Sequence, residues 1–359
     1  MTSAAQRKTV RRTAGGSALA LSAALSLAGG PAAAAPTTPV PAAAHIGTRP
    51  MCDTTAAPVR ASAAGLAAGR APAPAPAGTS AQQISYQLPA QAPLGLLTSS
   101  AVTLRTPVSK GTVHLDVTTT GFSTASLDFE RYVPATRSWV QLAVRSGEGS
   151  LPKHADFSFP VTAPTASAAR PYTVALRLQD LDLPGTLKVT ASVADGHGHT
   201  YRAPARTAAA TRPAVSVGGW PQGVPLVHGG PARTFTVTVH NTTDRTYPPL
   251  SGVLSAYGQS ATSTLRPADL VLQQYRAGHG WQRVTITPGG CDPGMFATLA
   301  GPVPGRLAPG ATAVYRLRLA VAATAPKDVP KVEAAINVGT GTASYFFWQD
   351  LSFAIADHR

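Results

Sequence analysis

The sequence predicts an all-β protein in which two β-sandwich domains follow, in tandem, an N-terminal region without a core. From about residue 84, short apolar segments alternate with polar residues at a period of two. Clusters of Gly, Pro, Ser and Asp separate these segments, and no long helical period interrupts them. A length of 359 residues suits two domains.

The composition excludes several fibrous classes of protein. Hydrophobic residues make up 44% of the chain, which is enough for real cores, and charged residues only 13%. There are 33 Gly and 33 Pro, but they follow no G-X-Y period, so the chain is not collagen-like. Long coiled coils are rich in Glu, and this chain has too little of it for that class.

The chain is basic, with 30 Lys and Arg against 16 Asp and Glu. Arg7, Lys8, Arg11 and Arg12 stand before residue 13, and the other positive residues form no run. We therefore expect most of them to be solvated on strand faces. The alternative is attraction to an anionic polymer. Nucleic acid is not an expected partner, because the aromatic residues are not interleaved with basic clusters.

Residues 1–34 have the three parts of a secretory signal peptide. The region up to Arg12 is purely positive, Ser17 to Leu27 is apolar or small, and small residues precede a cleavage site after Ala34. The apolar part is too short to span a bilayer, which needs about 20 residues. We expect an exported, extracellular protein without integral membrane insertion.

Residues 35–83 contain mostly Ala, Pro, Thr and Gly, with the alternating segment RAPAPAPAGTS at its end. Such a composition favours an extended chain and buries too little apolar surface for a core. We predict a disordered stalk.

Two cysteines, Cys52 and Cys291, fit an exported protein. An even number of cysteines in an oxidising compartment favours one disulfide bond between them. Two free thiols in loops are the alternative.

The first predicted sandwich covers residues 84–203. In TVHLDV, for example, Val113, Leu115 and Val117 share one face, and polar residues occupy the other. A short polar segment, 204–214, follows, and we predict that it is an interdomain linker.

The second predicted sandwich covers residues 215–359. In RTFTVTVHN, Phe235, Val237 and Val239 alternate with Thr, so they are expected to point into the core. A long loop is expected from Pro288 to Pro309.

The segments FTVTVHNTTDRTY, WQRVTI and LAPGATAVYRLRLAV resemble bacterial immunoglobulin-like domains of secreted and cell-surface proteins from high-GC Gram-positive bacteria. Asn241, Trp281 and Gly310 match that pattern. The resemblance implies that both sandwiches are immunoglobulin-like. It also implies a role in adhesion, spacing or accessory binding, without an enzyme domain.

The motifs of common hydrolases, zinc proteases and nucleotide-binding enzymes are absent from the sequence. Asp195, His197 and His199 in DGHGH offer metal-binding groups, but a flexible turn is the favoured interpretation. Asp128 and Glu130 share a strand face at a spacing that suits glycoside hydrolysis, yet nearby arginines favour ion pairing. We therefore predict no catalytic residues, no metal site and no cofactor.

Aromatic side chains are the better candidates for ligand binding. An aromatic pair on an exposed strand face can stack on sugar rings or on a partner protein. The candidates are Trp220, Trp281, Tyr345 and Trp348. Their alternative role is packing in the core.

The sequence as a whole predicts a non-enzymatic binding or spacer protein at the cell envelope or in the medium. A carbohydrate-binding accessory protein that recognises cell-wall polysaccharide is one alternative. A binder of another secreted protein, such as a protease inhibitor acting through the loop 288–309, is the other.

Overall fold

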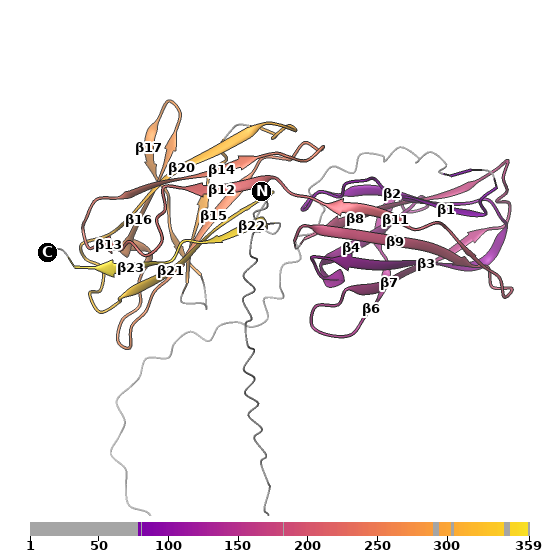
Figure 1. Ribbon diagram of the computed structural model, residues 1–359, viewed down its shortest axis with the longest axis horizontal. Coiled ribbons are helices and arrows are strands. Elements are labelled where there is room, and N and C mark those ends of the chain that lie inside the picture. The colour runs from indigo at the N-terminus through magenta and orange to yellow at the C-terminus, as the bar shows by residue number, and fades with distance from the viewer. Residues whose placement is uncertain are drawn as a thin grey trace, which may run out of the picture. The chain divides into compact units, whose positions relative to one another are not determined.

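The computed structural model describes residues 78–357, apart from 80, 182, 290–293, 303–304 and 341–344. The described chain is all-β and forms two sandwich-like domains, each with two sheets (Figure 1). This confirms the predicted fold class. The predicted signal peptide 1–34 and most of the predicted stalk 35–83 lie outside the described residues.

The first sandwich contains strands β1 to β11. One sheet has the order β1-β2-β8-β4-β5. The other has the order β10-β9-β3-β7-β6, and β11 also pairs with β9. The strand bounds are β1 Ile84–Gln87, β2 Thr98–Leu104, β3 Val108–Thr120, β4 Leu127–Val133, β5 Ser138–Gln141, β6 Ala143–Ser146, β7 His154–Ala163, β8 Tyr172–Asp180, β9 Gly185–Ala194, β10 Thr200–Arg202 and β11 Arg206–Ala210.

The second sandwich contains strands β12 to β23. One sheet has the order β12-β14-β20-β16-β17, and the other β13-β23-β21-β15-β19-β18 with β22 added on β21. The strand bounds are β12 Ala214–Gly218, β13 Leu226–Val227, β14 Arg233–His240, β15 Ser251–Tyr257, β16 Leu270–Arg276, β17 Gly280–Arg283, β18 Thr287–Pro288, β19 Met295–Leu299, β20 Thr312–Val321, β21 Lys331–Gly339, β22 Tyr345–Asp350 and β23 Phe353–Ala356.

The period-two pattern places the core as expected. In β14, Phe235, Val237 and Val239 are buried, while the threonines between them are more exposed. The same alternation buries one face of β3 in the first sandwich. Each sheet therefore buries one face and turns the other outward.

Two short strands lie where the sequence indicated loops. β11 occupies 206–210 within the predicted linker 204–214, and Ala208 and Ala210 bury their small side chains there. β19 interrupts the predicted loop 288–309, because Met295, Ala297 and Leu299 face the core. The prediction of one continuous loop over 288–309 is therefore wrong.

Two 3-10 turns are the helical elements among the described residues: η2, Thr124–Ser126, and η3, Pro267–Asp269. No helix in the described part of the chain is therefore long and apolar enough to cross a membrane.

Candidate functional site

The most exposed large aromatic side chain described lies on the outward face of the second sandwich. Trp348, on β22, has 63% of its surface exposed. Phe296, on β19 of the same sheet, is 40% exposed. Exposed rings on one sheet face are costly in water, because they leave large apolar surfaces solvated. They make this face a candidate binding surface.

Strand register explains how these two rings come to flank a depression. Asp350, Ala335, Ser255 and Phe296 are opposite one another across β22, β21, β15 and β19. Trp348 stands two residues before Asp350, so it lies on the same face. Three strand spacings of about 4.8 Å separate the strands that carry the two rings, about 14 Å in all.

The depression exists because small residues lie between large ones. Ala335 and Ser255 form part of the floor, and the rings of Trp348, Phe296 and Tyr257 rise around it. The resulting hollow, which we call the Trp348 hollow, has a volume of about 560 Å³. That volume lies within the range of sites for small molecules, roughly 300–1,000 Å³.

Polar groups stand among the rings of the Trp348 hollow. Glu333 and Asp350 contribute carboxylates, and Ser255 and Ser352 contribute hydroxyls. The backbone N–H of Ser352 donates to Asp350 Oδ1 over 3.1 Å, which fixes that carboxylate at the rim. Flat apolar rings with hydrogen-bonding groups beside them match a sugar ring, whose C–H faces are apolar and whose hydroxyls lie at its edge.

The loop that follows Tyr257 is tied to Asp328. The Oγ atoms of Ser260 and Thr262 donate to Asp328 Oδ2, the second over 2.6 Å. These bonds stabilise the ionised carboxylate and lower the pKa of Asp328 to about 2. The ionised form of Asp328 therefore helps to hold the loop that follows Tyr257.

This anchor should release the loop at low pH. Because the folded pKa is depressed, its stabilising effect is present above the usual value near 3.8 and is lost as the pH falls towards 2. We expect pepsin to cleave residues 258–265 faster at pH 2 than at pH 4, after correction for pepsin activity on an unfolded peptide. An Asp328→Ala variant should be cleaved equally fast at both. Equal pH dependence in the two proteins would refute this role.

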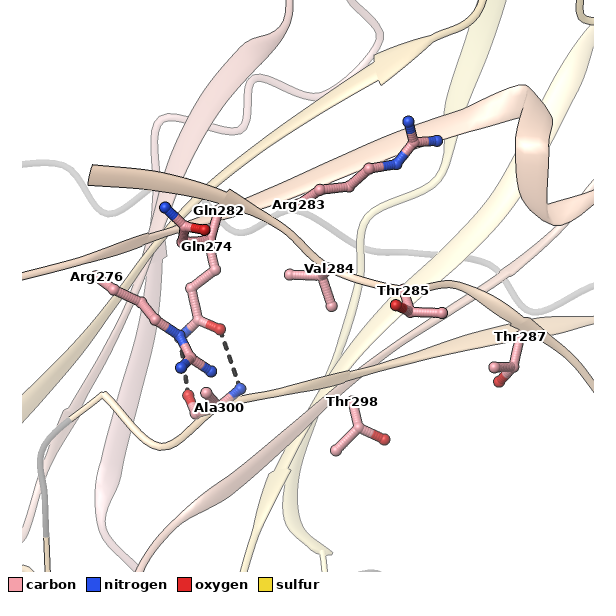
Figure 2. Close-up of a pocket in the computed structure, with 9 residues that line it drawn as sticks. All are labelled: Gln274, Arg276, Gln282, Arg283, Val284, Thr285, Thr287, Thr298 and Ala300. Atoms are coloured by element: carbon pink, nitrogen blue, oxygen red, sulfur yellow. Dashed lines mark hydrogen bonds between the residues drawn. The ribbon is translucent and has the colours of Figure 1, made fainter. Parts of the chain in front are cut away.

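A second hollow, of about 520 Å³, lies beside β16, β17 and β19 (Figure 2). Gln274, which is buried, donates from Nε2 to the carbonyl of Ala300 over 2.8 Å and accepts from its N–H over 3.0 Å. Figure 2 shows Arg283 pointing away from this pair. The lining is polar and contains no aromatic ring, so it lacks a stacking surface.

The structure separates the four aromatic candidates. Trp220 is buried, with 8% of its surface exposed, and packs against Phe235 at a centroid distance of 5.0 Å. It belongs to the core, so it offers no free ring face to a ligand. Trp281 is half-buried on β17. Tyr345 is half-buried on β22 and does not line the Trp348 hollow, so only Trp348 of the four does.

Phe296 and Tyr257 were missed by the sequence analysis. In MFATL, Phe296 stands at the outward position between two buried residues, Met295 and Ala297. An aromatic residue at a polar position of an alternating strand was the available signal.

The DGHGH segment forms a turn closed by Asp195. Its Oδ1 accepts hydrogen bonds from the N–H groups of His197 and His199, at 2.7 and 3.1 Å, and its Oδ2 lies 2.8 Å from His199 Nδ1. Burial raises the pKa of Asp195, but these hydrogen bonds outweigh it and leave the pKa below its usual value. The Asp195 carboxylate therefore stabilises the turn through these hydrogen bonds. No cluster of three metal-binding side chains occurs among the described residues.

The remaining candidates from the sequence are also accounted for. Glu130 forms an ion pair with Arg177, and Asp128 accepts a hydrogen bond from Gln141 over 2.9 Å. The cysteines of the predicted disulfide, Cys52 and Cys291, lie outside the described residues.

No family model and no curated protein matches the chain. Solved structures resemble it distantly. AvmM, which catalyses macrocyclization in alchivemycin A biosynthesis, is 17% identical over 41% of this chain and 90% of its own, with a TM-score of 0.31. A Salmonella α-2-macroglobulin is 12% identical over 76% of this chain and 16% of its own, with a TM-score of 0.28.

A third similar structure is a cohesin module from a family 33 glycoside hydrolase of Clostridium perfringens. It is 10% identical over 36% of this chain and 95% of its own, with a TM-score of 0.23. Similarities of this size assign neither a family nor a function.

Proposed function

We propose that this chain is an exported, non-enzymatic protein that binds a polysaccharide at the cell envelope or in the medium. In this proposal, the two sandwiches are immunoglobulin-like modules, as the segments around Asn241 and Gly310 suggest. The observation that carries the proposal is the Trp348 hollow.

Three properties of the hollow favour sugar over a protein partner. Its apolar surface is divided among separate rings, and the floor between them is built from Ala335 and Ser255. Carboxylates and hydroxyls stand close to the rings and can accept hydrogen bonds from sugar hydroxyls. The span of about 14 Å across four strands suits several linked sugar rings better than one small molecule.

A non-enzymatic role is supported by the state of the acidic groups. Glu130 is neutralised by Arg177, Asp195 holds its own turn, and Asp328 is kept ionised by hydroxyl groups. A general acid would need a carboxyl whose pKa is raised towards neutral pH. Among the described carboxyls with a shifted pKa, the shift is downward.

The test is sedimentation with insoluble chitin, cellulose and purified cell wall at about 50 and 500 mM salt. The protein used begins at residue 35. It should be retained on at least one polymer, and 500 mM salt should not release it, because stacking and hydrogen bonds are less screened than exposed charges.

Trp348→Ala should lower that retention about tenfold, since a ring contact of 1–1.5 kcal/mol corresponds to that factor. Tyr172→Ala is the matched control, because Tyr172 is 42% exposed on the first sandwich and lies far from the hollow in sequence. Retention on none of the polymers, or equal retention of Trp348→Ala and wild type, would refute the proposal. Stoichiometric inhibition of a secreted protease would instead favour the partner-binding alternative.

A further inference from the structure

The two sandwiches repeat one cluster of side chains on corresponding sheets. In the first, Tyr132 and Trp139 are opposite each other on β4 and β5, with ring centroids 5.4 Å apart. The guanidinium of Arg177, on β8, lies 4.5 Å from the centroid of Trp139. Arg177 is opposite Glu130, and the two form an ion pair.

The second sandwich contains the same cluster on β16, β17 and β20. Tyr275 and Trp281 are opposite each other with ring centroids 5.6 Å apart, and Arg318 lies 4.6 Å from Trp281. The residue opposite Arg318 is Gln273, whose Oε1 accepts from Arg318 Nε over 2.6 Å. The sheet orders β1-β2-β8-β4-β5 and β12-β14-β20-β16-β17 correspond strand by strand.

The common part of the cluster has a structural explanation. A cross-strand pair of rings needs cover from water, and an arginine stacked on a ring provides it by a cation–π contact. Because both sandwiches contain the arrangement, this packing alone gives no sign of a ligand. The differences between the two copies are informative.

The cluster in the second sandwich contains no acidic group and has arginines at two positions where the first sandwich has uncharged residues. Strand register places Gln273 where the first sandwich has Glu130, and Arg283 where it has Gln141. Arg316 precedes the stacked Arg318 by two residues. The first sandwich has Ala175 at the corresponding position, two residues before Arg177.

The whole sheet shows the same contrast. Strands β12, β14, β16, β17 and β20 contain five arginines and no Asp or Glu. Strands β1, β2, β4, β5 and β8 contain two arginines and three acidic residues. The second sheet is thus strongly basic, whereas its counterpart is slightly acidic.

We infer that the outward face of this sheet binds an acidic polysaccharide through its carboxylate groups. We call this surface the arginine face and define it by Arg283, Arg316, Arg318, Tyr275 and Trp281. It belongs to the sheet opposite the one that carries the Trp348 hollow, so it goes beyond the proposed function.

The geometry of the arginine face suits such a ligand. Arg316 lies 4.2 Å from the Tyr275 ring centroid, and stacking fixes the guanidinium while its N–H groups can still bind a carboxylate. Arg318 and Arg283 are two strand spacings apart, about 10 Å. Charges spread over that distance match an acidic polymer better than a single small anion.

The test uses polygalacturonate in native affinity electrophoresis at about 50 mM salt, with its fully methyl-esterified form as the neutral control. The acidic form should retard the protein, and the ester should not. Changing Arg283, Arg316 and Arg318 together to Gln should weaken binding about tenfold or more, because charge-assisted hydrogen bonds are lost.

A matched variant removes the same charge elsewhere. Arg145, Arg170 and Arg202 are exposed residues of the first sandwich, and their joint change to Gln should alter binding less than about twofold. If the triple variant folds poorly, the single variant Arg283→Glu serves as the test. Arg283 is exposed next to the ring pair, so this change alone should weaken binding. Trp348→Ala should leave polygalacturonate binding intact, which separates this result from the proposed function.

Three results would overturn the inference. Equal weakening by both triple variants would mean attraction to net charge alone. Equal binding of polygalacturonate and its ester would mean that carboxylates are not recognised. Tighter binding of polyphosphate or single-stranded DNA at the same salt concentration would assign the face to a phosphate polymer.

Discussion

Changing Trp220 to alanine is expected to lower the free energy of unfolding of the second sandwich by about 3–5 kcal/mol. Trp220 is buried, packs edge-on against Phe235 at 5.0 Å and lies 5.8 Å from Phe353 between ring centroids. The alanine variant removes this three-ring packing and leaves a cavity. Urea unfolding followed by far-UV circular dichroism measures the loss.

A Trp220→Phe variant is the matched control. It keeps an aromatic ring against Phe235 and removes the indole N–H, which is buried without a hydrogen-bond partner. We expect a smaller loss for this change, about 1–2 kcal/mol, because phenylalanine leaves only part of the indole volume empty. Polymer retention by the folded variants should equal that of the wild type. Unchanged stability with lost retention would return Trp220 to the ligand-binding candidates.

Asn241→Leu is expected to destabilise the same sandwich by about 1–3 kcal/mol, since the buried N–H of Thr243 loses its acceptor and a buried polar group left unpaired costs about that much. Asn241 is fully buried just after β14. Its Nδ2 donates to the carbonyls of Arg245 and Leu307, over 2.8 and 2.9 Å. Its Oδ1 accepts from the N–H and hydroxyl of Thr243, over 3.1 and 2.8 Å.

Leucine has the same number of side-chain heavy atoms in a similarly branched shape but can make none of these bonds. Two carbonyls therefore lose one donor each, and Thr243 loses its acceptor. The neighbouring Thr242→Ala is the control, because Thr242 is exposed and donates one hydrogen bond, to the carbonyl of Arg212. It should cost about 1 kcal/mol or less. Urea unfolding followed by far-UV circular dichroism measures the loss of stability in both variants. A loss below about 1 kcal/mol for Asn241→Leu would show that other groups hold the turn.

The strands with clean alternation could be predicted from the sequence, because burial of one sheet face fixes which residues are apolar. In β3 and β14, the predicted inward residues are the buried ones. β11 and β19 could not be predicted in this way. They are short, and β11 buries only alanines, whose small side chains give little hydrophobic contrast.

The candidate site could be predicted only in part. Strict alternation would place Phe346 with Trp348 on one face and Phe347 on the other. The pairing of β21 with β22 is irregular at Val338/Gly339, and both phenylalanines are buried whereas Trp348 is exposed. Such an irregularity depends on the partner strand, which a single segment does not reveal.

The partners of the exposed aromatic residues also depend on register. Phe296 joins Trp348 only because β15 and β21 lie between their strands. Tyr275 meets Trp281 across a hairpin whose register the turn sets. Trp281 and Trp348 could be identified in the sequence, whereas the surfaces to which they belong depend on strand order.

The second sandwich carries its two proposed surfaces on opposite sheets, as described above. A domain with recognition surfaces on both sides is bivalent even as a single copy. If both surfaces bind as proposed, one polymer can lie against each side, separated by the two sheets, which pack about 10 Å apart. The domain would then cross-link the glycan bound in the Trp348 hollow to an acidic one. Its retention in a polymer network would exceed what either surface gives alone, because the second binding event takes place at a high effective concentration.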